Sequence, residues 1–290
     1  MTSSFPTLEE FLAAPIEAIQ EVAPATVIYN PGGTRRGAFL AGVPMDEYAD
    51  WTTDQMLQIA DLLFQHGVRH VFITLLGPKN MQEVTPEYRE HLWRWAGFVA
   101  HDRIMTLYQQ KGWRVRILYQ EYLPKLRETV ERLQETLSSQ SPYTVWYMFT
   151  PERLLPLRWM RDALRDADLE NSEETIRLLY GEAVPPATFF LGYGKPTMLA
   201  EFLPPFIYEE LSCYWLQRPH YLDERELRTM FYDYAYLRRT WQQDKSERTA
   251  QVQRYRKAWE NAPIVGLGTR LGPFWYPASI PEPPLPDDEV

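Results

Sequence analysis

Short apolar runs alternate along this chain with longer segments in which apolar residues recur every three or four positions. The short runs are rich in β-branched and aromatic residues, a pattern typical of strands that are buried on both faces. The predicted strands cover residues 25–29, 70–76, 114–120, 144–149 and 188–193, with a sixth candidate at 212–216.

The longer segments have the periodicity of amphipathic helices. In residues 53–66 the apolar side chains share one face, Thr52 and Gln55 have the spacing of a capping box, and Gly67 ends the pattern. Further helices are predicted at 87–110 and 123–137. Strands that alternate with helices in this way predict an α/β fold, with a mostly parallel central sheet flanked by helices.

The pattern changes after residue 216. Residues 223–259 predict one long helical region with an apolar stripe, whose members are Leu227, Met230, Phe231, Tyr234, Leu237 and Trp241. The last segment contains too many prolines for regular structure. Because we find no internal repeat and no clear linker, we expect one domain over residues 1–276 and a proline-rich acidic tail at 277–290.

Composition narrows the classes of function. The 290 residues carry a net charge of −9, which argues against general nucleic-acid binding because no excess of cations is available for phosphates. The single cysteine, Cys213, excludes an intramolecular disulfide and suits a reducing cytosol. Without a signal-type N-terminus or an apolar run of membrane-spanning length, we expect a cytoplasmic protein. Aromatic residues reach 14%, which fits either an aromatic core or a cavity for a bulky hydrocarbon or a cation.

One motif carries candidate chemistry, the stretch "NPGGTRR" directly after the first predicted strand. Gly32 and Gly33 can turn their N–H groups toward an anion, and Thr34 adds a hydroxyl donor. Arg35 and Arg36 supply planar guanidinium groups suited to phosphate oxygens. Ligands of parallel sheets bind beyond the carboxyl ends of the strands, where this motif would lie. Two alternatives stay open, an anion site or a Gly-Gly turn followed by two solvated arginines.

These residues also resemble a known family, the cis-prenyltransferases, and in particular its terpene-forming branch, the tuberculosinol and kolavelool synthases. The Asp-Gly-Thr-Arg-Arg pattern of that branch matches residues 32–36 at four of five positions. Tyr48 in "DEYADW" and Tyr88 in "PEYREHL" match tyrosines of the branch. Further similar segments are "LFQHG", "LGYGKPT", "FYDYAYLRR" and "RYRKA". The resemblance covers most of residues 5–276.

The resemblance implies an enzyme that binds a diterpenyl diphosphate, ionises its allylic C–O bond and traps the cation. Arg35 and Arg36 would stabilise the leaving group. The implied diphosphate-binding residues are Gly32, Gly33, Thr34, Arg35, Arg36, Lys195, Arg254 and Arg256. Tyr48 and Tyr88 would orient water or shield the cation, although each could equally be a core tyrosine.

One position departs from the family pattern. The aspartate that assists ionisation in the family, usually with Mg²⁺, is Gly32 here. Asp46, Asp50 and Glu201 are the candidate metal ligands in its place, although the start of a solvated helix would also explain Asp46 and Asp50. We favour Mg²⁺-assisted catalysis through these acids; catalysis by the cationic side chains without metal is the alternative.

The predicted function is that of a diphosphate-releasing terpene synthase. A partner class II cyclase would supply the bicyclic diterpenyl diphosphate, and water would capture the cation to give a tertiary alcohol. Two alternatives stay open: transfer to a nucleophile such as adenosine, or a non-catalytic partner subunit of a cis-prenyltransferase. We also expect a homodimer, because the related fold is usually dimeric and residues 223–241 carry more apolar surface than a sheet edge needs.

Overall fold

The computed structural model describes residues 5–44, 46–82, 85–136, 141–165, 171–195, 203–216, 221–238, 267–271 and 274–277. The chain divides into two compact units, Met1–Arg238 and Arg239–Val290. In the second unit, β7 (Gly268–Leu271) and β8 (Phe274–Pro277) pair as antiparallel strands. The single domain over 1–276 and the tail at 277–290 stay predictions.

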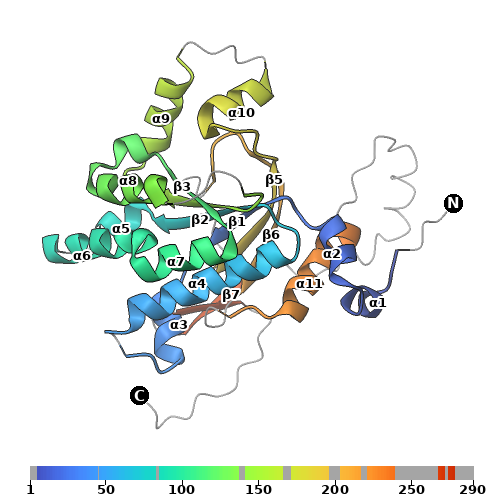
Figure 1. Cartoon of the computed structure of the whole chain (residues 1–290). Coiled ribbons are helices and arrows are strands. Elements are labelled where there is room, and N and C mark those ends of the chain that lie inside the picture. Colours follow the sequence, from blue (N-terminus) through green and yellow to red (C-terminus); the bar gives the residue numbers. More distant parts are fainter. Residues whose placement is uncertain are drawn as a thin grey trace, which may run out of the picture. The chain divides into compact units, whose positions relative to one another are not determined.

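A sheet of six parallel strands forms the centre of the first unit, in the order β3-β4-β2-β1-β5-β6 (Figure 1). The predicted α/β fold with a parallel central sheet is therefore confirmed, and each predicted strand is present. The bounds are β1 Thr26–Asn30, β2 His70–Leu76, β3 Arg114–Leu118, β4 Thr144–Phe149, β5 Ala187–Tyr193 and β6 Tyr208–Leu216.

Two strands differ from the prediction by more than one residue at an end. β3 stops at Leu118, short of residue 120, because Tyr119 has a φ of 64° and a 3-10 turn, Gln120–Tyr122, follows. β6 begins at Tyr208 rather than at residue 212. Cys213 lies in β6 and is half-buried.

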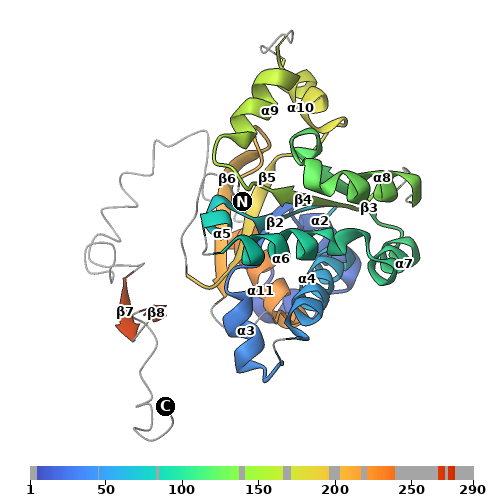
Figure 2. The ribbon, with the colours of Figure 1, turned by 90° about the vertical axis from the view of Figure 1, so that its left-hand side faces the viewer.

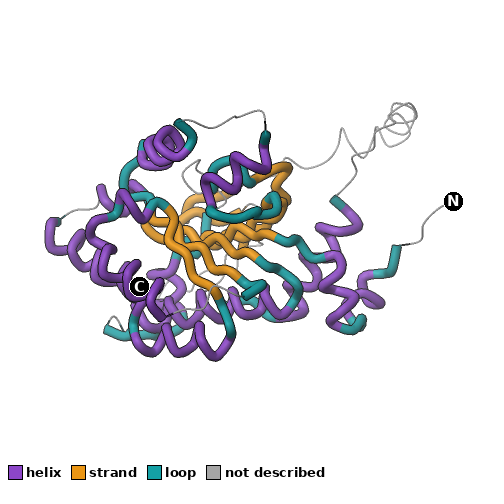
Figure 3. Tube along the Cα trace, turned by 45° about the horizontal axis from the view of Figure 1, so that its top comes forward, coloured by secondary structure: helices purple, strands orange, loops and turns teal. Residues whose placement is uncertain are grey.

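Helices cover both faces of the sheet. Their bounds are α1 Leu8–Leu12, α2 Ile16–Val22, α3 Thr34–Leu40, α4 Tyr48–Gln65, α5 Pro78–Gln82, α6 Pro86–Ala96, α7 Asp102–Lys111, α8 Arg127–Thr136, α9 Leu155–Ala163, α10 Ser172–Tyr180 and α11 Glu224–Tyr232. Figure 2 shows α9 and α10 on one side of the sheet and α4 and α11 on the other, and Figure 3 shows the strands enclosed between helices.

Aromatic contacts identify the residues on each face. On one face, Tyr180 of α10 packs edge-on against Phe72 and Trp146. On the opposite face, Tyr147 of β4 shares a hydrogen bond of 2.7 Å with Tyr108 of α7. The rings of Phe189 and Phe231 join β5 to α11 on that same face.

The helix boundaries differ more from the sequence prediction than the strand boundaries do. The helix predicted from residue 53 begins at Tyr48, so Thr52 and Thr53 are buried inside α4 and do not cap it. The Thr53 hydroxyl donates to the carbonyl of Ala49, 2.8 Å away, which satisfies it within the helix. Gly67 does end the helix, with a φ of 99°.

The segment predicted as one helix at 87–110 is divided in two. α6 gives way to a 3-10 turn at Gly97–Ala100, and His101 is extended before α7 begins at Asp102. The segment at 123–137 starts with a 3-10 turn, Pro124–Leu126, ahead of α8.

The long helix predicted at 223–259 is described only as far as Arg238. Asp223 caps α11 in a capping box with Glu226, and a π-helical turn, Asp233–Leu237, follows. The predicted apolar stripe is buried at Leu227, Met230, Phe231 and Tyr234, whereas Leu237 is 54% exposed and Trp241 lies outside the described residues.

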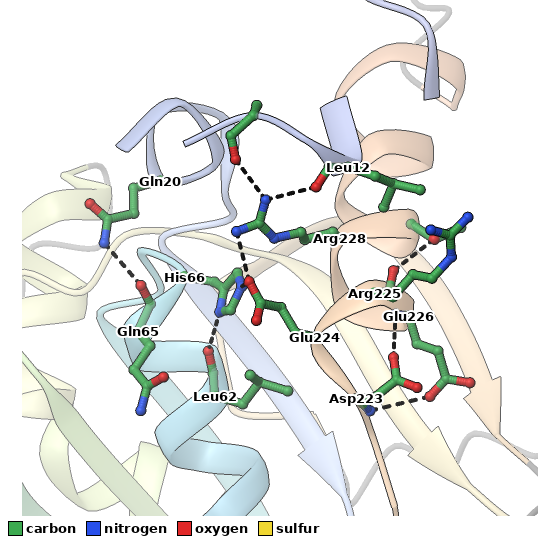
Figure 4. A network of polar contacts seen from close by, with 12 residues as sticks. Leu12, Gln20, Leu62, Gln65, His66, Asp223, Glu224, Arg225, Glu226 and Arg228 are labelled. Atoms are coloured by element: carbon green, nitrogen blue, oxygen red, sulfur yellow. Dashed lines mark hydrogen bonds and ion pairs between the residues drawn. The ribbon is translucent and has the colours of Figure 1, made fainter. Parts of the chain in front are cut away.

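A polar network fastens α11 to the N-terminal segment (Figure 4). The guanidinium of Arg228 donates to the carbonyls of Leu12 and Ala14 at 3.0 and 2.7 Å, and pairs with Glu224 at 2.7 Å. Glu224 in turn lies 3.5 Å from Nε2 of His66, at the end of α4. In the described part of the chain, no helix has the length and apolar character needed to cross a membrane.

Candidate active site

The predicted anion motif lies at the carboxyl end of β1 as a tight turn followed by a helix. Gly33 has a φ of 74°, which places it in the left-handed region where glycine is favoured, and α3 begins at Thr34. The N–H of Gly32 donates to the carbonyl of Asn30 at 2.9 Å. Arg35 and Arg36 therefore stand in the first turn of α3, and Arg35 is the more exposed of the two.

A second glycine turn touches the first. β5 runs beside β1 and ends at Tyr193, and Gly194 follows with a φ of 84°. A Cβ atom added to Gly33 would lie 3.8 Å from the Cα of Gly194. The neighbouring strands thus bring the exposed Lys195 to the same edge of the sheet as the arginine motif.

The guanidinium of Arg36 lies against both turns. Its Nη2 atom is 3.6 Å from the Cβ position of Gly33 and 3.8 Å from that of Gly194. Arg36 is half-buried. A cationic fork is therefore held beside two glycine turns, which is an arrangement suited to an anion with several oxygens.

Two further predicted residues meet at this motif. The hydroxyls of Thr34 and Tyr48 share a hydrogen bond of 2.5 Å, which joins the start of α3 to the start of α4. Tyr88 belongs to α6, but its side chain lies outside the described residues. Arg254, Arg256 and Glu201 also lie outside them.

Comparison with characterised proteins decides the family. The chain is 42% identical over 278 residues to a (+)-kolavelool synthase of Herpetosiphon aurantiacus, a match that covers 94% of this chain and 96% of that protein. This chain belongs to the kolavelool synthase family of terpene synthases. It is therefore an enzyme, and the alternative of a non-catalytic subunit does not apply. No protein-family model matches the chain.

More distant relatives agree with this family. A tuberculosinyl adenosine transferase of Mycobacterium tuberculosis is 25% identical over 249 residues, covering 79% of this chain and 83% of that protein. Among solved structures, lavandulyl diphosphate synthase from Lavandula x intermedia superposes with a TM-score of 0.60 at 14% identity, over 74% of this chain and 97% of that chain. A probable undecaprenyl diphosphate synthase from Campylobacter jejuni gives 0.55 at 13%, over 74% and 96%. These two structures show that the kolavelool synthase family has the cis-prenyltransferase fold.

The turn has no room for the acid that the family pattern places at position 32. A Cβ atom on Gly32 would lie only 2.7 Å from the backbone oxygen of Tyr193. Gly32 is not among the glycines with a positive φ; the left-handed position is Gly33. The constraint at Gly32 is therefore the close approach of β5 and not backbone conformation.

The candidate metal ligands lie apart from any carboxylate cluster in the described part of the chain. Asp46 is exposed in the turn before α4, and Asp50, whose side chain is 81% exposed, lies 3.7 Å from Arg103 of α7. Within the described ranges, no group of three or more His, Cys, Asp or Glu side chains could hold a metal ion. Because Glu201 lies outside the described residues, the use of Mg²⁺ stays a prediction, and we derive no step through a metal.

Sequence reasoning missed one pair of residues at the turn. Asn30, at the end of β1, is 9% exposed, and its Oδ1 accepts a hydrogen bond of 3.1 Å from the hydroxyl of Thr74 in β2. The same oxygen lies 3.8 Å from the Cβ position of Gly32. A buried amide at the end of an apolar strand was the available signal, since such groups are costly unless they are paired.

Proposed function

We propose that this enzyme ionises an allylic, bicyclic diterpenyl diphosphate and captures the cation with water, giving a tertiary diterpene alcohol. The proposal is carried by the position of Arg36 over two glycine turns in a chain 42% identical to a (+)-kolavelool synthase. A partner class II cyclase would supply the bicyclic substrate.

The turn residues would bind and withdraw the leaving group. As the allylic C–O bond breaks, both bonding electrons remain with the diphosphate, whose negative charge increases. Arg36, Arg35 and Lys195 would stabilise that charge, together with the N–H group of Gly33 and the Thr34 hydroxyl. The Thr34–Tyr48 hydrogen bond would hold this hydroxyl in place. Gly32 would contribute through the shape of the turn, because its N–H already donates to the carbonyl of Asn30.

A second outcome for the cation has support of its own. The 25% identity to a tuberculosinyl adenosine transferase favours capture by a nucleophile such as adenosine. Incubation with geranylgeranyl, kolavenyl and tuberculosinyl-type diphosphates, with and without adenosine, separates the two by mass spectrometry of the products. No turnover of any of these substrates would contradict the proposed function.

Three accompanying predictions need measurements of their own. If Mg²⁺ assists catalysis through Asp46, Asp50 and Glu201, excess chelator should abolish turnover. If the cationic side chains act without metal, turnover should persist in chelator. A homodimer requires a sedimentation mass near twice the 34.2 kDa of one chain. A cytoplasmic location requires activity in the soluble cell fraction.

A further inference from the structure

Three tyrosines lie in one row across the central sheet. The strand register places Tyr29 of β1 beside Ile73 on one side and Leu191 on the other. Ile73 pairs with Tyr147 of β4, and Leu191 pairs with Tyr214 of β6. Partners in a parallel register point to the same face, so these three tyrosines share a face with the contact between Tyr147 and α7.

Only the outer two have a partner for the hydroxyl among the described residues. Tyr147 shares its hydrogen bond with Tyr108, and Tyr214 donates to Oδ2 of Asp233, each at 2.7 Å. The hydroxyl of Tyr29 is buried and makes no hydrogen bond within the described part of the chain. A buried polar group without a partner is costly, so its presence needs an explanation such as a bound water or ligand.

Other donors without partners come from the same side of the sheet. The hydroxyl of Thr52 in α4 and the indole N–H of Trp95 in α6 are buried and make no hydrogen bond among the described residues. α4 lies beside α7, which it meets through the Asp61–Lys111 ion pair of 2.8 Å. Trp95 packs on Phe98, which packs on Tyr147. Polar atoms in an otherwise apolar region are the kind of site that holds an ordered water.

Tyr29 belongs to the strand that leads into the proposed diphosphate site. Tyr29 precedes the glycine turn at the carboxyl end of β1, where the proposed diphosphate binds. In an allylic diphosphate, the far end of the allylic cation is two carbons from the carbon that carried oxygen. The carbon to be hydrated is therefore close to the anchored leaving group, and a residue at the end of β1 can reach it.

We propose that the Tyr29 hydroxyl holds the water that captures the allylic cation, which makes Tyr29 a further catalytic residue and rests on the proposed function. Tyr29 accepts a hydrogen bond from this water, leaving an oxygen lone pair directed at the cation. The water oxygen forms the new C–O bond, and its proton passes to the released diphosphate. Tyr29 itself stays neutral, since burial, with Tyr193 nearby, raises the pKa of its hydroxyl well above the ordinary value.

The test compares Tyr29→Phe with Tyr147→Phe in the full chain, using the diterpenyl diphosphate that wild type converts, in H₂¹⁸O. Without the held water, the cation loses a proton and forms an alkene. We expect Tyr29→Phe to lower the ratio of labelled alcohol to alkene about tenfold, as for the loss of one hydrogen bond. Tyr147→Phe should keep the wild-type ratio.

Thermal unfolding of the free proteins gives a second, activity-independent readout. Tyr147→Phe loses a hydrogen bond, so its Tm should fall by about 2–4 °C. Tyr29→Phe loses no hydrogen bond to a described residue, so its Tm should fall less than that of Tyr147→Phe or not at all. An equal fall in both variants, or an unchanged product ratio in an active Tyr29→Phe, overturns this inference alone. A wild type that converts no diterpenyl diphosphate overturns the proposed function, and this inference with it.

Discussion

Arg36 is the residue on which the proposed chemistry depends most. Its guanidinium lies between the Gly33 and Gly194 turns, so truncation removes a charge-assisted donor from the proposed leaving group. We expect Arg36→Ala to lower kcat/KM by roughly 30- to 1,000-fold, equivalent to about 2–4 kcal/mol of transition-state stabilisation. Steady-state kinetics test this, with circular dichroism to check folding. Unchanged turnover would support the alternative of a surface turn with solvated arginines.

An aspartate at position 32, which would restore the family pattern, does not fit the turn without a shift of its neighbours. The backbone oxygen of Tyr193 occupies the place of a Cβ, at 2.7 Å. We expect Gly32→Ala to destabilise the protein by about 1–3 kcal/mol in urea unfolding, and Gly32→Asp at least as much. Gly97→Ala is the matched control, because its Cβ would meet Thr129 at an ordinary 3.8 Å. A fully stable Gly32→Asp with metal-dependent turnover would show that the turn can open for an acid.

At the level of elements, α3 and α4 are coupled through the Thr34–Tyr48 hydrogen bond. We expect Tyr48→Phe to lower turnover about two- to tenfold, because it removes the hydrogen bond that holds the Thr34 hydroxyl. Thr34→Val should lower turnover at least as much, because it also removes that hydroxyl from the proposed diphosphate site. In a double-mutant cycle, adding Tyr48→Phe to Thr34→Val should then cost little more. Fully additive losses would mean that the two hydroxyls act independently on the substrate.

The strands could be predicted from sequence because apolar β-branched and aromatic runs, buried on both faces, leave few alternatives. The start of α4 could not be predicted from the sequence. Thr52 and Thr53 have the chemistry of helix caps, and only the folded helix shows Thr53 bonding back to Ala49. The close approach of Gly32 to Tyr193 could not be predicted from the sequence either. It depends on β1 and β5 being neighbours in the sheet, although they are far apart in sequence.

For the whole molecule, the arginine motif, Lys195 and Tyr48 could be placed from the resemblance, and the parallel sheet does bring the motif and Lys195 to one edge. Tyr29 and Asn30 could not be singled out in the same way. Their significance lies in which buried polar atoms have partners, and the register across several strands determines this. Sequence therefore locates the turn of glycines and arginines, while the pairing of the buried polar groups beside it can be seen only in the folded sheet.

One buried histidine contributes to the way in which the stability of the whole molecule depends on pH. His70, at the start of β2, is 6% exposed and its Nδ1 accepts a hydrogen bond of 3.2 Å from the indole N–H of Trp146. Burial lowers the pKa of His70 from 6.5 to about 4; Glu182 opposes this shift, while Arg114 and Arg69 add to it. The unfolded chain therefore binds a proton at a higher pH than the folded chain does. Folding stability is fully present above pH 6.5 and falls as the pH drops toward 4.

The expected loss is about 3 kcal/mol by pH 4, from the size of this shift. His70→Gln keeps a hydrogen-bond acceptor but does not titrate, so the variant lacks this part of the acid sensitivity. Urea unfolding of wild type and His70→Gln, measured in steps from pH 7.5 to 4, should show the wild type losing its advantage over the variant as the pH falls. A difference that stays constant over this range would mean that the pKa of His70 is the same in the folded and unfolded chains, and that other groups set the acid limit.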